Sequence, residues 1–129
     1  MSAITDLDLL LRSLSPSVRD GDYVFVCTDR DLPAEARITE SEGTTLVLPR
    51  AVADAEGLAY DAVFGWITLE VHSDLAAVGL TAAFSQALAQ AGIGCNVVAG
   101  TIHDHLFVPF AQAADAMAVL RALQRQAAG

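Results

Sequence analysis

The chain has 129 residues, which suits one compact domain or two small modules that share a core. Hydrophobic residues make up 53% of it and charged residues 18%, so the composition excludes a disordered protein. The net charge of −9 repels phosphate backbones and anionic lipids, which excludes nucleic acid and membrane surfaces as the expected partners.

The N-terminal segment predicts a helix over residues 5–14, because four leucines follow the i, i+3, i+4, i+7 spacing of one helix face. Thr5 and Asp8 stand three residues apart, as in a capping box, and Pro16 and Gly21 then interrupt the pattern. The leucines of the stripe are Leu7, Leu10, Leu11 and Leu14.

Short strands and a helix are predicted over the next forty residues. Aromatic and β-branched residues at 22–28 indicate a strand. Residues 35–49 indicate two more strands, joined at Ser41-Glu42-Gly43. Residues 50–58 predict a short helix that ends at Gly57.

Residues 63–71 carry the strongest strand pattern in the chain, because their side chains alternate between two faces. Trp66 lies on the more polar face, where it would either form an exposed contact surface or be covered. We expect the leucine-rich helix or the first module to cover it. One face would hold Ile67, Leu69 and Val71, and the other Trp66, Thr68 and Glu70.

The second half continues with a helix at 80–92, two strands within 94–110 and a final helix at 111–126. From Trp66 onward the order is therefore strand, helix, strand, strand, helix, which is a ferredoxin-like βαββαβ unit without its last strand. We expect an α+β protein with an antiparallel sheet, helices packed on one face, and two modules at 1–62 and 63–129.

Three ordered motifs, "HSDLAAVGLTAAFS", "AGIGCNVVAG" and "HDHLFVP", resemble those of small bacterial ACT-like proteins. The N-terminal "LLLRSLSPSVRDGDYVFVC" fits the same family, so the resemblance covers nearly the whole chain. It implies tandem ACT-like modules that sense amino acids or other small metabolites at interfaces between units. It also implies side-by-side assembly, and a ligand near the loop from the first strand to the first helix.

That loop spans residues 72–80, and its physical chemistry suits a ligand independently of the resemblance. A turn into a helix exposes amides that attract carboxylates, and Gly79 lets the backbone approach a ligand closely. The alternative is that Gly79 only allows helix packing and that Ser73 or Asp74 only caps the helix. The candidate ligand-binding residues are Ser73, Asp74, Val78, Gly79, Leu80, Asn96, His103 and Asp104.

The run His103-Asp104-His105 raises the question of a metal or catalytic site. Two histidines separated by one residue would share a strand face, and His72 could lie near His103 or far from it. However, Asp104 sits at the apparent hairpin turn, where aspartate bonds its own backbone. No fourth metal ligand is evident and no nucleophile elbow is present, so we predict no metal, no cofactor and no catalytic residue.

Cys27 and Cys95 lie in apolar strand-like runs without C-x-x-C spacing, which indicates reduced, buried residues in a cytoplasmic protein. The sequence thus predicts a non-catalytic sensor whose partners are a small molecule, a second copy of the chain, or another protein. The alternatives are a ligand-free scaffold for a protein partner and a small metal-dependent enzyme.

Overall fold

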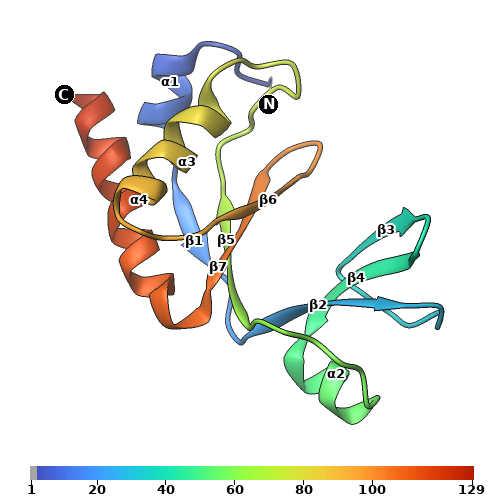
Figure 1. The fold of residues 1–129 in the computed structure, drawn as a ribbon. Coiled ribbons are helices and arrows are strands. Elements are labelled where there is room, and N and C mark those ends of the chain that lie inside the picture. Colours follow the sequence, from blue (N-terminus) through green and yellow to red (C-terminus); the bar gives the residue numbers. More distant parts are fainter. Residues whose placement is uncertain (1–2) are drawn as a thin grey trace.

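The computed structural model describes residues 3–129, which form a curled seven-stranded sheet with helices packed on it (Figure 1). The strands are β1 (Pro16–Val18), β2 (Tyr23–Thr28), β3 (Ala36–Glu40), β4 (Gly43–Pro49), β5 (Phe64–Leu69), β6 (Asn96–Ala99) and β7 (Asp104–Pro109). The helices are α1 (Leu7–Arg12), α2 (Arg50–Ala55), α3 (Leu80–Gln90) and α4 (Ala113–Ala128), with a 3-10 turn at Phe110–Gln112. The strand order is β3-β4-β2-β5-β7-β6, with β1 paired to β5, and these seven strands pair antiparallel.

The predicted ferredoxin-like unit is present, and the N-terminal part of the chain completes it. β1 pairs with β5 from Pro16↔Leu69 to Val18↔Ile67, which gives the local order β1-β5-β7-β6. The strand missing from residues 64–128 is therefore supplied by residues 16–18, where the sequence indicated only a break at Pro16. The boundary between residues 62 and 63 stays a prediction, although α1 and β1 both contact the second half.

All four helices pack on the convex face of the sheet, as predicted (Figure 1). α1, α3 and α4 cover β5 and β7 through fully buried side chains that include Leu10, Phe84 and Leu106. α2 covers β2 and β4 through Ala53, so each half of the sheet has its own apolar core on this face. A Cβ on Gly65 would lie 2.9 Å from that of Ala113, so this glycine allows the start of α4 to approach β5 closely.

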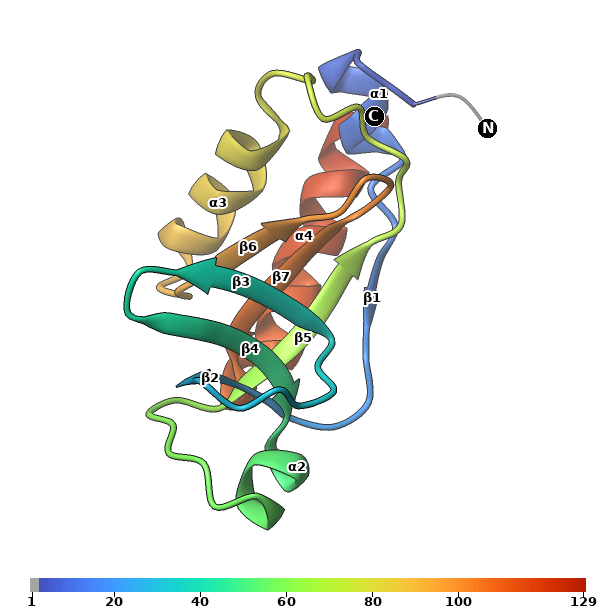
Figure 2. The same cartoon turned by 90° about the vertical axis from the view of Figure 1, so that its right-hand side faces the viewer.

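The concave face holds a third core, built mainly from aromatic side chains. The Phe107 ring lies 4.7 Å from that of Trp66 and 5.1 Å from that of Phe25, measured between ring centroids. Tyr23 and Val47 pack there as well, so the first half covers Trp66, which is 4% exposed. Figure 2 shows β3 and β4 folded across β6 and β7 on the side opposite the helices. Trp66 is thus covered by the first module, while α1 lies on the other face.

Two local predictions were wrong. The N-cap of α1 is Asp6, whose carboxylate accepts the Leu9 amide at 3.3 Å, and the Thr5–Asp8 capping box does not form. Cys27 is exposed because it lies near the end of β2, beyond the cover of the cores, while Cys95 is partly buried. Burial raises the pKa of the Cys95 thiol to about 11. No helix within residues 3–129 is long and apolar enough to cross a membrane.

Candidate functional site

The loop from β5 to α3 is held in place by the N-terminal backbone. The Ile4 amide donates to the His72 carbonyl at 2.9 Å, and the Asp74 amide donates to the Ile4 carbonyl at 3.0 Å. The Asp74 carboxylate accepts the Ala76 amide at 2.7 Å, which is an Asx turn. These contacts fix the course of the chain into α3 before any ligand is present.

A hollow of about 100 Å³ opens where this loop enters α3, on the convex side of the sheet. Among residues 3–129, no side chain caps the first turn of α3, whose N-cap is Gly79 at φ 102°. The amides of that turn therefore have no side-chain acceptor and provide a partial positive charge. We call this feature the Ser73 hollow; it is lined by Ser73, Asp74, Leu75, Ala77, Leu80, Thr81, Ala99 and Asp104.

Asp104 supplies the one carboxylate that reaches the Ser73 hollow from the sheet. It is the first residue of β7 and is 9% exposed, and the Ser73 side chain beside it is 8% exposed. Burial raises the pKa of Asp104 above its usual value, while the charge of His105 and the Ser73 hydroxyl act in the opposite direction. A buried carboxylate thus lies in the same hollow as the uncapped helix start.

The structure brings together half of the residues predicted to bind a ligand. Ser73, Asp74, Leu80 and Asp104 line the Ser73 hollow. Val78 is 84% exposed and lies outside its wall.

Gly79 adjoins the hollow as the N-cap of α3 but does not line it, and Asn96 and His103 lie elsewhere. A Cβ on Gly79 would lie 3.0 Å from Leu7 Cδ2, so this glycine gives room to a packed leucine. Asn96 borders a separate hollow of about 250 Å³ next to Phe25 and Phe64. His103 Nε2 lies 3.7 Å from Glu70 and lines a hollow on the concave side. The contact with Leu7 therefore supports the alternative that Gly79 allows close packing. Asn96 and His103 line other hollows than the Ser73 hollow.

The His-Asp-His run spans the end of the β6–β7 hairpin turn and the start of β7. The hairpin turn ends at His103, where the Gly100 amide donates to the His103 carbonyl at 2.8 Å. Asp104 is therefore a strand residue and not the turn residue we expected. Asp104 points into the Ser73 hollow and His105 toward Trp66, because successive strand residues face opposite sides. No group of three potential metal ligands occurs within residues 3–129.

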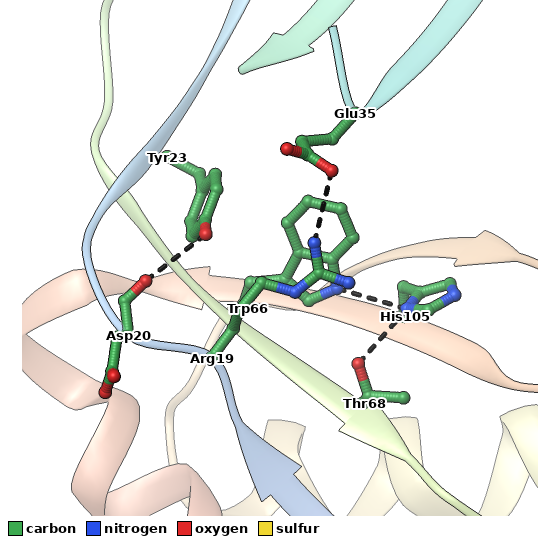
Figure 3. Close-up of polar contacts among 7 residues, drawn as sticks. All are labelled: Arg19, Asp20, Tyr23, Glu35, Trp66, Thr68 and His105. Carbon is green, nitrogen blue, oxygen red and sulfur yellow. Dashed lines mark hydrogen bonds and ion pairs between the residues drawn. The ribbon is translucent and has the colours of Figure 1, made fainter. Parts of the chain in front are cut away.

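A polar cluster that the sequence did not reveal lies on the concave face (Figure 3). The Arg19 guanidinium stacks 3.6 Å from the centroid of the Trp66 ring, and its Nη1 lies 3.4 Å from Glu35 Oε2. The Arg19 amide also donates to the Trp66 carbonyl at 2.8 Å. Residues 19 and 66 are far apart in sequence, and only the pairing of β1 with β5 brings them together.

His105 completes this cluster. Its Nδ1 accepts the Trp66 indole N–H at 3.1 Å, and the Thr68 hydroxyl lies 3.2 Å from the same atom. An indole nitrogen can only donate, so Nδ1 is unprotonated and the proton of the neutral ring is on Nε2. Burial lowers the pKa of His105, and the positive charges of Arg19 and His103 lower it further.

The antiparallel sheet is curled, its helices pack on the convex face, and a hollow adjoins the loop before α3. Together these features define a tandem ACT-like fold. The sequence matches the ACT domain over residues 2–65 and again over residues 62–122. This chain belongs to the ACT domain family. No curated protein matches it.

Solved structures share this architecture. A protein of unknown function from Vibrio cholerae, described as a possible transport protein, is 45% identical, with a TM-score of 0.83 over 92% of this chain and 95% of that one. The ligand-free regulatory subunit of aspartate kinase from Thermus thermophilus is 9% identical, with a TM-score of 0.61 over 84% and 97%. A putative C-terminal regulatory domain of aspartate kinase from Porphyromonas gingivalis is 14% identical, with a TM-score of 0.57 over 85% and 96%. The last two likenesses concern the fold alone.

Proposed function

We propose that this protein is a non-catalytic regulatory sensor that binds an α-amino acid in the Ser73 hollow. The observation that carries the proposal is the buried carboxylate of Asp104 in the same hollow as the uncapped start of α3. Membership in the ACT family supports a regulatory role, and the aspartate kinase structures of similar fold are themselves regulatory units.

The two ends of an α-amino acid match the two charges of the hollow. The ammonium group would pair with Asp104, which otherwise remains a buried carboxylate at a cost in solvation. The carboxylate would accept the free amides at the start of α3, where the helix dipole favours negative charge. A hydroxyl both donates and accepts, so Ser73, which also lines the hollow, would bond either group.

The size of the hollow supports a shared binding site. About 100 Å³ is below the roughly 300 Å³ of an ordinary ligand pocket, so it would hold only the backbone end of an amino acid. Large apolar side chains stand exposed on the neighbouring loops: Leu75 at 68%, Val78 at 84% and Ile102 at 50%. We propose that a second copy of the chain covers this rim and encloses the ligand side chain.

Thermal unfolding in the presence of each of the twenty amino acids tests the proposal. A ligand at one hundred times its Kd adds about 2.7 kcal/mol, which raises the Tm of a domain of this size by about 10 °C. Asp104→Asn should weaken that ligand by about 30-fold or more, because the ammonium group loses its buried counter-charge. The same variant should raise the Tm of the ligand-free protein at pH 7, since burial disfavours the charged carboxylate.

Asp31→Asn is the matched control, because it removes the same charge from a side chain that is 96% exposed. It should leave both the ligand response and the Tm of the free protein nearly unchanged. If no amino acid raises the Tm, the sensor proposal is wrong and the exposed rim supports a ligand-free scaffold. If a shift survives Asp104→Asn at full size, the ligand binds somewhere other than the Ser73 hollow.

A further inference from the structure

The concave face carries two further hollows that share part of their walls. One has a volume of about 270 Å³ and lies between Trp66, Glu35 and the strand β6. The other has about 370 Å³ and lies toward Ser17, Thr68 and Glu70. Both are lined by Arg19 and His105, and we call the two together the Arg19 cleft. Its larger part falls within the usual size of a small-molecule pocket.

Arg19 stands at the junction of the two hollows with most of its donors unused (Figure 3). A guanidinium group carries five N–H donors, and its only acceptor within residues 3–129 is Glu35. The Trp66 ring packs against one face of the Arg19 guanidinium. The Arg19 amide donates to the Trp66 carbonyl and the Glu35 amide donates to the Val47 carbonyl, each at 2.8 Å, so backbone hydrogen bonds anchor both residues. The group is thus pre-positioned for a planar acceptor such as a carboxylate.

His105 offers a second donor to the same space. Because Nδ1 accepts the Trp66 indole, the Nε2–H of the neutral ring is left to donate. Nε2 points toward Gly100, where an added Cβ would lie 3.3 Å from it, and Gly100 also lines the smaller hollow. An acceptor entering the cleft would therefore meet donors on Arg19 and His105.

The existing ion pair does not close the cleft. The side chains of Arg19 and Glu35 are 40% and 46% exposed, and an ion pair as exposed as this contributes little stability. An incoming carboxylate could replace Glu35 at small cost while keeping the stacking on Trp66. Glu35 then acts as an internal competitor for the ligand.

The far end of the cleft carries the opposite charge. Glu70 accepts the Ser17 hydroxyl at 2.7 Å and lies 3.7 Å from His103, and its side chain is 48% exposed. A second negative charge on a ligand would meet this carboxylate, whereas an ammonium or hydroxyl group could bond to it. The cleft therefore favours one carboxylate per ligand.

We propose that the Arg19 cleft is a second ligand site, which binds a small monocarboxylate with a donor group at its far end. The carboxylate accepts from Arg19 and His105, and the distal ammonium or hydroxyl group reaches Glu70. The site lies on the opposite face of β7 from the Ser73 hollow, so it is separate from the amino-acid site proposed above.

Trp66 is the only tryptophan in the chain and reports on the cleft directly, through its contacts with Arg19 and His105. The probes are 4-aminobutyrate, butyrate and succinate, which share a four-carbon chain and differ at the far end. We expect a saturable change in Trp66 emission with a Kd of about 0.1–10 mM for 4-aminobutyrate, weaker binding of butyrate and weakest binding of succinate. Sodium chloride at matched ionic strength corrects for screening.

Three variants locate the response. Arg19→Gln should remove it, while Arg37→Gln, which deletes the same charge from an exposed ion pair on β3, should keep it. Glu35→Gln should tighten 4-aminobutyrate by about two- to five-fold, because the internal competitor is gone. Asp104→Asn should leave the response unchanged, which separates this site from the Ser73 hollow.

The absence of a saturable change in the native protein up to about 50 mM overturns the proposal. So does a response that persists in Arg19→Gln, or a preference for succinate over 4-aminobutyrate. If Arg19→Gln proves unfolded by circular dichroism, Glu35→Gln decides the matter: binding equal to or weaker than native contradicts the role given to Arg19.

Discussion

The two faces of β7 place adjacent residues in opposite surroundings. Asp104 points to the convex side, where a buried carboxylate shares a small hollow with the start of α3. His105 points to the concave side, where it accepts the Trp66 indole beside the Arg19 guanidinium. A single peptide bond separates an environment suited to a cation from one suited to an anion.

This difference also reverses the response to pH. Burial raises the pKa of Asp104, so the folded state binds that proton more readily than the unfolded chain does, and acid stabilises it there. Burial, Arg19 and His103 lower the pKa of His105, so acid destabilises the folded state there. In both cases burial favours the neutral side chain. The effect of acid on stability has opposite signs because neutral aspartate carries the titrating proton, whereas neutral histidine has lost it.

The largest effect is expected from Phe107→Ala. This variant removes the central side chain of the concave core and leaves the packing on the convex face unchanged. Phe107 is fully buried and packs against Trp66 and Phe25, so its loss should lower the free energy of unfolding by about 3–5 kcal/mol. The Trp66 emission and the carboxylate response of the Arg19 cleft should change with it. The amino-acid response of the Ser73 hollow should persist below the lowered Tm, because the convex packing is retained.

Phe110→Ala is the matched control, since this phenylalanine lies just beyond β7 and is 49% exposed. Urea unfolding should show a much smaller loss for it. Equal losses for the two variants, or simultaneous loss of both ligand responses in folded Phe107→Ala, would contradict the independence of the two faces.

Gly100→Ala should disturb both faces together, with an intermediate effect. A Cβ at this position would lie 2.9 Å from the His103 carbonyl oxygen, a backbone atom that can move only if the hairpin moves. We expect a loss of about 1–3 kcal/mol and a weaker ligand response at both sites, because the hairpin carries Asp104 and His105. Gly94→Ala, where an added Cβ meets nothing within 4 Å, should unfold like the native protein. Chemical denaturation of the pair checks this, and identical curves would show that the hairpin adapts freely.

Local patterns in the sequence were sufficient to predict most of the elements. The alternation at residues 63–71 placed Ile67 and Leu69 against the helices and Trp66 on the other face, as observed. β1 was missed because three residues are too few for a periodic signal. Its partner strand, which includes Leu69, also lies far away in the sequence.

The candidate site was predictable only where it follows the loop into α3. Ser73, Asp74 and Leu80 lie close together in sequence, and the hollow gathers them. Gly79 meets Leu7, and Arg19 meets Trp66, through packing between segments that no local pattern connects. Asp104 was assigned to the turn because strand pairing, which sets the hairpin closure at Gly100 and His103, is not visible in the residues themselves.

The smallest effect, and the sharpest test of the two-face comparison, is the pH dependence of stability. As pH falls from 7 to 5, protonation of His105 removes the acceptor of the Trp66 indole, which should cost the native protein about 1 kcal/mol. Positive Arg19 and His103 oppose that proton, and negative Asp104 and Glu70 partly offset them.

His105→Gln keeps an acceptor oxygen without titrating, so its urea-unfolding free energy should be flatter over this range than that of the native protein. Asp104→Asn should instead lose the stabilisation that acid gives through the raised pKa, so its free energy of unfolding should fall more steeply than that of the native protein as the pH drops further toward the usual pKa of an aspartate. Slopes that change in the same direction for His105→Gln and Asp104→Asn would mean that the two sides of β7 are not the opposite environments described.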